Sequence, residues 1–344
     1  MSRGTINIVK VLMKAVALIS GGLDSALAAK IVMEQGIEVC GFTVVHVFLE
    51  SIKSTTSSYA EKSANELGIT LHSYKASQDF LNVIKYPKYG YGKNMNPCLD
   101  CRVHMLIKAG RYMKEIGASF LITGEVLGER PMSQRRDAMN IVDRDSGLKG
   151  LILRPLSAKL LSPTVPEIRS WICRDGLFDI QGRSRKHQFM LAKQYGIREF
   201  SAPAGGCLLT EPNFARRIKD LMKFKPNFTL DDIELLKIGR HFRLPSGIKV
   251  IVGRNERENN KLLKLAGNKI IWIEPQSVPG PTVLLERNAN DEDARIAILL
   301  CSTYCKKAGA SVCVDMFKNK QHQVIELGRG ERVSDKDIES WRIA

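Results

Sequence analysis

The sequence predicts an α/β protein in which a doubly wound parallel sheet is followed by a smaller C-terminal α+β domain. Apolar runs of strand length alternate with helical segments from residue 14 onward, a pattern typical of parallel strands joined by crossover helices. After Pro226 the pattern changes to short apolar segments separated by turn residues. The chain has 344 residues, more than one core usually organises, so two domains are expected.

The individual elements follow from the spacing of apolar residues, which is two in strands and close to 3.6 in helices. We expect strands at 15–19, 38–47 and 70–74, helices at 25–35, 56–67 and 101–116, and a further strand that ends at Gly124. The segment after Gly124 is polar and charged, which predicts a mobile loop and then a helix. Near the C-terminus, a long helix over 291–308 precedes a last pair of strands.

Changes in composition along the chain predict its domain organisation. The stretch after residue 180 becomes basic, and it is crossed by the Pro- and Gly-rich sequence SAPAGGCLLTEPNF. We expect an N-terminal extension (1–12), an α/β domain (13–180), a basic connecting segment that carries Cys207 (181–225) and a C-terminal domain (226–344).

The charge and the cysteine content limit the partners and the compartment. The formal net charge is +16, which favours a polyanionic partner such as nucleic acid over a membrane. The apolar stretch at 11–19 is too short to span a bilayer and no cleavage site follows it, so we expect a cytoplasmic protein. Eight cysteines in that compartment are expected to be reduced, and clustered ones then indicate metal or redox chemistry.

The sequence ALISGGLDSALAAK predicts an anion-binding notch between the first strand and the first helix. The first N–H groups of a helix have no partner within it, and their partial positive charge attracts phosphate. Gly21 and Gly22 remove the Cβ atoms that would keep a phosphate away, and Ser20 and Ser25 offer hydroxyl groups. Asp24 could cap the helix or help hold Mg²⁺ near a leaving pyrophosphate. The alternative is a plain capped turn.

The notch resembles the loop of the N-type ATP pyrophosphatases, whose signature is SGGxDS after a first strand. It lacks both the Gly-Lys-Ser/Thr of a Walker loop and the third glycine of a dinucleotide fingerprint. The resemblance implies an adenine nucleotide alpha hydrolase-like (PP-loop) fold that binds ATP. It also implies that a carbonyl or carboxylate oxygen attacks the α-phosphate of ATP, which yields an adenylated substrate and pyrophosphate.

The same resemblance implies where the nucleotide lies. Adenosine would cross the tips of the first two strands, with the Leu18 backbone in contact and Phe42 and Thr43 flanking the base. Gly124 would lie beside the ribose or the adenine. A purely structural place in a buried strand is the alternative for Phe42. Donors in the polar segment after Gly124 could steady the phosphates, or belong to a solvated basic loop. These donors are Arg130, Gln134, Arg135 and Arg136.

Three cysteines indicate the chemistry that follows activation. Cys98 and Cys101 form a C-x-x-C at the entry to a helix, where the helix end favours thiolate, and Cys207 is flanked by glycines in APAGGCLLT. These stretches resemble the 2-thiouridine synthases of tRNA (the MnmA family), with Cys101 and Cys207 at that family's two cysteine positions. Cys98 stands where the family carries aspartate.

A third cysteine at that place matches the three-cysteine pattern of the iron–sulfur thiolases. This resemblance implies that Cys98, Cys101 and Cys207 hold a [4Fe–4S] cluster with one iron open to hydrosulfide. One alternative is a cluster-free route in which Cys207 carries a persulfide and Cys101 resolves it. A second alternative is structural zinc with His104 as a fourth ligand, although His104 is expected to pack or hydrogen-bond on its helix.

Basic residues close to Cys207 and in the C-terminal domain are candidate RNA contacts. The stretch KVIVGRNERENNKLLKLA and the later VPGPTVLLE resemble the NFACT RNA-binding domain over roughly 243–330, which implies RNA contacts at Arg254, Asn259 and Lys261. Asn255 is a further candidate, with a structural turn as the alternative. The main RNA-binding candidates are Arg183, Arg185, Lys186, Arg216, Arg217 and Arg254.

These observations together predict an ATP-dependent tRNA (or other RNA) sulfurtransferase. It would adenylate a pyrimidine carbonyl, that of uridine first, and replace the oxygen with sulfur from an external donor, with Mg²⁺ bound to ATP. We expect Cys98, Cys101, Cys207 and Asp24 to carry the chemistry. Two other classes stay open: a small-molecule ligase or nitrile synthase with the same loop, and a non-catalytic RNA-binding factor.

Overall fold

The computed structural model forms two compact units, Met1–Cys207 (unit 1) and Leu208–Ala344 (unit 2). The predicted connecting segment therefore divides between them after Cys207. The structure describes residues 13–49, 55–201, 207–266, 270–276, 278–306, 311–318, 321–328 and 330–343.

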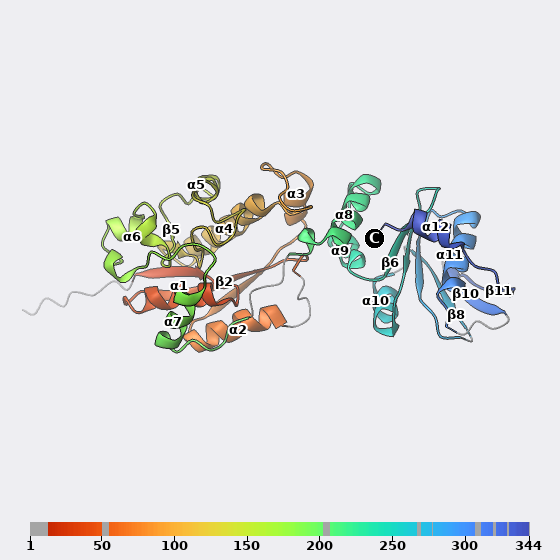
Figure 1. Cartoon of the computed structure of the whole chain (residues 1–344), viewed down its shortest axis with the longest axis horizontal. Coiled ribbons are helices and arrows are strands. Elements are labelled where there is room, and N and C mark those ends of the chain that lie inside the picture. Colours follow the sequence, from red (N-terminus) through yellow and green to blue (C-terminus); the bar gives the residue numbers. More distant parts are fainter. Residues whose placement is uncertain are drawn as a thin grey trace, which may run out of the picture. The chain divides into compact units, whose positions relative to one another are not determined.

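Unit 1 is built on a five-stranded parallel sheet in the order β3-β2-β1-β4-β5 (Figure 1). Every strand pair is parallel, and Leu18 of β1 lies opposite Phe42 of β2. The strands are β1 (Lys14–Leu18), β2 (Glu38–Val45), β3 (Leu71–Lys75), β4 (Phe120–Ile122) and β5 (Ile152–Leu153). The predicted doubly wound sheet is confirmed.

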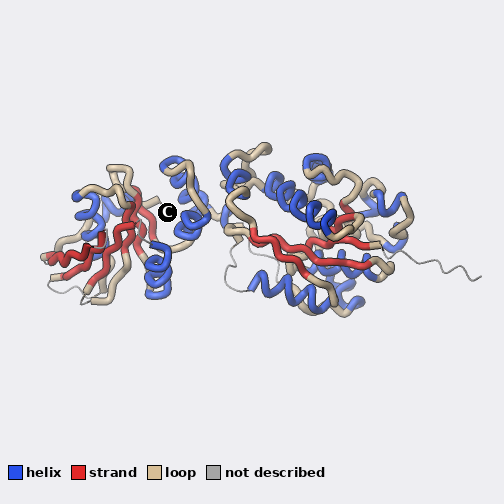
Figure 2. Tube along the Cα trace, turned by 180° about the vertical axis from the view of Figure 1, so that it is seen from behind, coloured by secondary structure: helices blue, strands red, loops and turns tan. Residues whose placement is uncertain are grey.

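Helices cover both faces of this sheet, which appears as a layer between them in Figure 2. Residues of α1, α2 and α7 form an apolar core with one face, and residues of α4 and α5 form a second core with the other. The helices are α1 (Leu23–Met33), α2 (Thr55–Leu67), α3 (Phe80–Lys85), α4 (Cys98–Glu115), α5 (Arg136–Asp145), α6 (Val165–Ile168) and α7 (Lys186–Tyr195). Because parallel strands are joined by crossovers, the helices that follow strands begin at the carboxyl edge of the sheet.

Unit 2 contains a six-stranded antiparallel sheet in the order β11-β10-β8-β9-β7-β6. Its helix α11 begins with a capping box between Asn290 and Asp293, which satisfies free N–H groups of the first turn. The strands are β6 (Arg240–Arg243), β7 (Lys249–Val252), β8 (Ile270–Pro275), β9 (Val283–Glu286), β10 (Val312–Lys318) and β11 (Gln321–Leu327). The helices are α8 (Pro212–Phe224), α9 (Leu230–Leu236), α10 (Glu256–Ala266), α11 (Asp291–Thr303) and α12 (Asp335–Trp341). The predicted separate α+β domain is confirmed.

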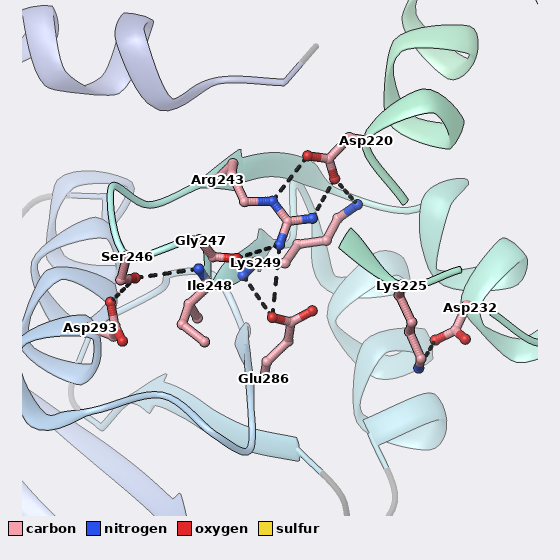
Figure 3. Close-up of polar contacts among 10 residues, drawn as sticks. All are labelled: Asp220, Lys225, Asp232, Arg243, Ser246, Gly247, Ile248, Lys249, Glu286 and Asp293. Atoms are coloured by element: carbon pink, nitrogen blue, oxygen red, sulfur yellow. Dashed lines mark hydrogen bonds and ion pairs between the residues drawn. The ribbon is translucent and has the colours of Figure 1, made fainter. Parts of the chain in front are cut away.

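A buried ion cluster joins helix α8 to the sheet of unit 2 (Figure 3). The Asp220 carboxylate accepts hydrogen bonds from Arg243 Nε at 3.0 Å and from Lys249 Nζ at 3.0 Å. Burial opposes the ionisation of Asp220, but Arg243 and Lys249 outweigh it, so the pKa of Asp220 lies below its usual value. The contact fixes the basic helix α8 to the domain that follows it.

Glycine and asparagine residues of the NFACT-like stretch have structural roles in unit 2. Asn259 of α10 donates from Nδ2 to the Gly280 carbonyl at 3.1 Å and accepts from the Thr282 N–H at 3.1 Å. A Cβ atom on Gly253 would lie 2.0 Å from Asn259 Oδ1, so only glycine fits there. Asn259 thus ties α10 to the loop before β9.

No helix in the described part of the chain is both long enough and apolar enough to span a bilayer.

Candidate functional site

The notch between β1 and α1 has the geometry of an anion site at the carboxyl edge of the sheet. The loop is closed on itself: the Ser25 hydroxyl donates to the Gly22 carbonyl at 2.7 Å and accepts from the Ser20 N–H at 3.2 Å. No side chain caps the N-terminus of α1, so its first N–H groups are available to a ligand.

Two glycines allow this loop to form. Gly21 has a φ of +78°, and a Cβ atom there would lie 2.8 Å from the Tyr59 side chain and the Ala60 nitrogen of α2. Gly124, just after β4, lies so close to the loop that a Cβ atom would be 2.4 Å from the Asp24 carbonyl carbon. Gly124 therefore brings the end of β4 against the start of α1.

Asp24 lies in this site with part of its carboxylate unpaired. Its Oδ2 is 3.5 Å from the guanidinium of Arg185, while its Oδ1 is buried and has no hydrogen-bond partner. Burial raises the pKa of Asp24, and the charges of Arg185 and Arg130 oppose that increase. Gln188 on α7 is fully buried beside Asp24 and helps to oppose the rise in the pKa of Asp24, but neither polar atom of its amide makes a hydrogen bond of normal geometry among the described residues. Such groups are costly to bury unless a ligand satisfies them.

The acidic and basic groups around Asp24 interact with one another. Burial raises the pKa of Glu129, the charge of Asp24 adds to the increase, and Arg130 and Arg185 oppose it. The charge of Arg130 also acts on Cys98, whose pKa is raised by burial. Arg130 therefore lies within electrostatic reach of both the loop carboxylate and the first cysteine.

Cys98 and Cys101 occupy the first turn of α4. The Cys101 thiol lies 4.0 Å from the sulfur of Met105, one turn further along the helix. Burial raises the pKa of Cys101 to about 12, and the nearby Cys207 and Cys98 add to the increase. The three predicted cysteines therefore lie close enough for their charges to interact.

Backbone pairing brings Cys207 to the same edge of the sheet. Ser201 pairs with Gly22 of the loop, and its N–H donates to the Gly21 carbonyl at 2.8 Å. Cys207 pairs with Leu49, which follows β2. Both ends of the 201–207 stretch are thus fixed beside the carboxyl ends of β1 and β2.

A buried ion network connects the cysteines to the loop. Arg102, next to Cys101, donates from Nε to Glu125 Oε1 at 2.8 Å, and Arg154 donates to Glu125 Oε2 at 2.8 Å. Glu125 directly follows Gly124, which contacts the backbone of Asp24. Burial opposes the ionisation of Glu125, but Arg102 and Arg154 outweigh it and lower its pKa to about 2.

The three cysteines supply the type of donor that an iron–sulfur cluster uses, but the described part of the structure does not arrange them as a metal site. A thiol with a pKa of about 12 becomes a thiolate at neutral pH only when a cation stabilises it, and three neighbouring thiols form the donor set that iron–sulfur clusters use. Within the described residues, no three His, Cys, Asp or Glu side chains are arranged to hold a metal ion. His104 instead packs against Phe80 with ring centroids 5.2 Å apart, and its Nε2 atom has no partner. The zinc alternative therefore gains no support.

Three residues that were predicted to contact the nucleotide have buried side chains. The Phe42 side chain is 1% exposed and packs in the core beside Tyr112, with ring centroids 5.4 Å apart. Its carbonyl accepts a hydrogen bond from the Ile19 N–H at 2.8 Å. The Phe42 side chain therefore takes the core position that was the structural alternative, and the expectation that Phe42 flanks the base stays a prediction. Leu18 and Thr43 are also buried.

The predicted RNA contacts separate into exposed and buried residues. Arg183, Lys186 and Arg216 are exposed. Arg185 lies instead beside Asp24. Arg217 is partly buried and donates to the Leu236 carbonyl at 2.8 Å.

Arg254, the remaining RNA candidate, is exposed but pairs with Glu258. Sequence reasoning missed Arg102, Glu125 and Gln188 as members of the site. Their only sequence signal is position: Arg102 follows the C-x-x-C, and Glu125 follows the glycine that ends β4.

Comparison with known families identifies both parts of the chain. Residues 11–163 match the family model described as "Thiamine biosynthesis protein (ThiI)", and residues 239–342 match the "NFACT protein RNA binding domain". The first part of the chain is thus similar to a thiamine-biosynthesis (ThiI) family and the last part to an NFACT RNA-binding domain. Both resemblances stated from the sequence are confirmed.

Individual relatives match only part of the chain. A "Probable tRNA sulfurtransferase" of Thermococcus kodakarensis is 34% identical over 152 residues, 42% of this chain and 36% of the relative. A "tRNA-specific 2-thiouridylase MnmA" of Syntrophomonas wolfei is 35% identical over 118 residues, which is 33% of each chain. The chain thus spans about a third of the length of these relatives.

Among solved structures, the "U34-tRNA thiolase NcsA from Methanococcus maripaludis with its [4Fe-4S] cluster" is similar with a TM-score of 0.35 and 19% identity. The alignment covers 68% of this chain and 74% of that one.

Proposed function

We propose that this chain is an ATP-dependent tRNA sulfurtransferase that adenylates a uridine carbonyl and replaces its oxygen with sulfur. One observation carries the proposal: an unbroken series of contacts joins the loop to the cysteines. It runs from Asp24 to Gly124, through the adjacent Glu125 to Arg102, and so to Cys101. An activated carbonyl and a sulfur source at that edge would be neighbours, as the two-step reaction requires.

In the first step, the uracil carbonyl oxygen attacks the α-phosphorus of ATP and the bond to the β-phosphate oxygen breaks. The N–H groups at the start of α1 would bind the phosphates that leave as pyrophosphate. Mg²⁺ would travel with ATP, and the unpaired Oδ1 of Asp24 is the candidate group to contact it or its water. Arg130 and Arg185 would balance the negative charge that pyrophosphate carries away.

In the second step, hydrosulfide sulfur adds to the activated carbon, the bond from carbon to the bridging oxygen breaks, and AMP leaves with the original oxygen. The sulfur proton is released, so no oxidant or reductant is consumed. Cys98, Cys101 and Cys207 would hold a [4Fe–4S] cluster, which supplies an iron without a protein ligand where hydrosulfide can bind. Arg102 and Glu125 would fix the helix turn that presents Cys101.

The persulfide route is the second candidate, favoured by the electrostatic proximity of Cys101 and Cys207. Cys207 would donate the outer sulfur of its persulfide, and Cys101 would then attack the sulfur that stays on Cys207. A disulfide between the two would form, and an external thiol would have to reduce it. This route requires no function of Cys98, so the effect of replacing Cys98 distinguishes the two routes.

The exposed basic residues and the NFACT-type domain support tRNA as the substrate, and sulfur would come from an external donor. The cytoplasm is the proposed location, because tRNA and ATP are both available there.

The test is an assay of anaerobically purified full-length protein with unmodified tRNA, ATP, Mg²⁺ and sulfide. We expect thiouridine by mass spectrometry, one AMP per thiolated base, and iron and sulfide in the wild type. Cys98→Ala and Cys101→Ala should lose iron and thiolation, and the exposed Cys173→Ala should keep both.

Each alternative gives a different result. Iron-free protein that thiolates tRNA without Cys98 would indicate the persulfide route. AMP release that depends on a small molecule and not on RNA would indicate a ligase. RNA binding with no ATP turnover would indicate a non-catalytic factor.

A further inference from the structure

One face of the sheet in unit 2 is only partly covered. Helix α11 and the apolar side chains beneath it cover the first face along its length. On the second face, Leu262 and Ala266 of α10 pack with Ile251 and Leu284 of the neighbouring strands β7 and β9. Strands β8, β10 and β11 continue beyond this helix, and side chains of β11 on this face are exposed, including Val324 at 55%.

Three aromatic rings form a continuous stack across these outer strands. Phe317 of β10 lies opposite Trp272 of β8 and opposite His322 of β11. The Trp272 and Phe317 ring centroids are 3.7 Å apart with planes 12° from parallel, and the Phe317 and His322 centroids are 4.6 Å apart at 16°. Nearly parallel rings at these distances stack face to face, so each ring stands on the sheet with its faces toward the neighbouring strands.

The two ends of the stack differ. At one end Trp272 packs against the apolar cluster beneath α10. At the other end His322 lies on β11, the edge strand of the sheet, and its side chain is 48% exposed. The stack is therefore closed by protein at Trp272 and open at His322, where a further planar ring would continue it.

The His322 ring is held in position. Its Nε2 lies 2.5 Å from Asp315 Oδ1, and the same oxygen accepts a hydrogen bond from Gln276 Nε2 at 2.8 Å. A ring fixed in this way loses little conformational entropy when a ligand stacks on it. The arrangement is thus preorganised for stacking.

Basic side chains border the stack on its α10 side. Arg257, Lys261 and Lys264 are exposed at positions i, i+4 and i+7 of α10, so they form one basic stripe on the helix that borders Trp272. Lys318 follows Phe317 on β10. The acidic residues beside Trp272 and Phe317 on this face are occupied: Asp315 by His322 and Gln276, and Glu274 by the Thr282 hydroxyl at 2.7 Å. Glu326, four positions from His322 on β11, is exposed.

We propose that the open end of the Trp272–Phe317–His322 stack binds an unpaired base of RNA, with the bordering lysines and arginines contacting the phosphates. This inference rests on the proposed RNA substrate and adds where and in what form that RNA is bound. Stacking on an aromatic ring needs an exposed base face, which single strands and loops offer and duplexes conceal. The site therefore prefers unpaired nucleotides and binds them with little dependence on their base sequence.

The test measures the binding of full-length protein to a ten-nucleotide single-stranded RNA and to a ten-base-pair RNA duplex by fluorescence anisotropy. We expect His322→Ala to weaken single-strand binding about tenfold, within the range for loss of one stacked ring, and to leave duplex binding unchanged. His322→Tyr keeps a ring at the open end and should bind within about threefold of wild type. Val324→Ala, on the same strand and face, is the matched control and should bind as wild type.

Other outcomes overturn the inference. Equal binding by wild type and His322→Ala would overturn it, as would a wild type without preference for the single strand. If His322 had only a structural role, His322→Ala would reduce the melting temperature and the affinities for both the single strand and the duplex. His322→Tyr would then not restore single-strand binding selectively. The proposed activity fails separately: a wild type that makes no thiouridine, but whose RNA binding depends on His322, would overturn the sulfurtransferase and leave the stacking site intact.

Discussion

Arg185 is a largely buried partner of Asp24 and not an isolated charge on the surface. Its guanidinium lies 3.5 Å from the Asp24 carboxylate, and its buried Nε atom has no hydrogen-bond partner among the described residues. A loose pair with free hydrogen-bonding capacity on both sides leaves room for a phosphate or a hydrated cation between them. The arrangement fits a site that tightens when a nucleotide binds.

Replacing Arg185 should therefore affect ATP turnover. Arg185→Gln is expected to lower tRNA-dependent AMP formation about 100-fold, the size of effect seen when one preorganised donor is removed. Because Arg185 opposes the burial that raises the pKa of Asp24, the variant should also move the acid limb of the pH–rate profile to higher pH. The exposed neighbour change Lys186→Gln should leave the limb in place, and an unshifted limb in Arg185→Gln would contradict the assignment.

At the scale of elements, the ion network on Glu125 holds three segments in register. Arg102 comes from α4, Glu125 follows β4, and Arg154 follows β5 and also binds Asp143 of α5 through two bonds of 2.6 and 3.0 Å. Both oxygens of the Glu125 carboxylate and of the Asp143 carboxylate accept hydrogen bonds from arginine, and little of the network is exposed. Removing one member leaves buried charges without a partner, which costs more than the pair contributes.

Glu125→Gln is therefore expected to lower the free energy of unfolding by about 3 kcal/mol at neutral pH. The folded pKa of Glu125 is about 2, below the ordinary 4.5, so its contribution is complete above pH 4.5 and is lost as the pH falls toward 2. Urea denaturation at pH 7 and pH 3 measures this difference, which should shrink at the lower pH. Glu38→Gln removes an exposed pair with Lys14 and should cost less than 1 kcal/mol. A Glu125→Gln effect that is equal at both pH values would refute the ionic role.

Helices and strands whose apolar residues recur at regular spacing were predictable from the sequence. Elements whose extent depends on tertiary contacts were not. The strand starting near Ala15 and the helix after the glycine pair follow from apolar spacing alone. The short helix α3 (Phe80–Lys85) was not expected, because six residues are too few to show the apolar spacing of a helix in the sequence. The helix expected over 291–308 ends at Thr303.

The same limit applies to the site. The loop and the C-x-x-C are local patterns, so sequence reasoning found them. The burial of Phe42 against Tyr112 and the approach of Arg185 to Asp24 join residues 70 and 161 positions apart, and no local pattern encodes them. A strand-end phenylalanine looks the same in sequence whether its ring meets a ligand or a helix.

At the scale of the whole molecule, basic residues are distributed over both units. Arg183 and Lys186 are exposed in unit 1, and α8 and α10 carry basic residues in unit 2. A polyanion bound by several such contacts releases counterions, so its affinity falls steeply with salt.

Removing two exposed cations should lower that dependence by a definite amount. The double variant Arg183→Gln/Lys186→Gln is expected to reduce the slope of log K against log salt for tRNA by about 1.5, because each phosphate contact contributes about 0.7 to 0.9. Binding measured between 50 and 200 mM salt gives the slope. Changing Lys62 and Lys75 to Gln, which removes the same charge elsewhere on unit 1, is the control. A slope that changes equally in both would mean that only net charge matters.

The division of the chain directly after Cys207 has a consequence for how such a protein can arise and be rebuilt. Every group assigned to the proposed activation and sulfur delivery precedes that peptide bond, and none of them lies in the described part of unit 2. Under the proposed function, exchanging unit 2 for another nucleic-acid-binding domain would change the RNA that is bound and leave the reacting groups in place. The specificity for RNA and the chemistry of the reaction could then evolve independently within one gene.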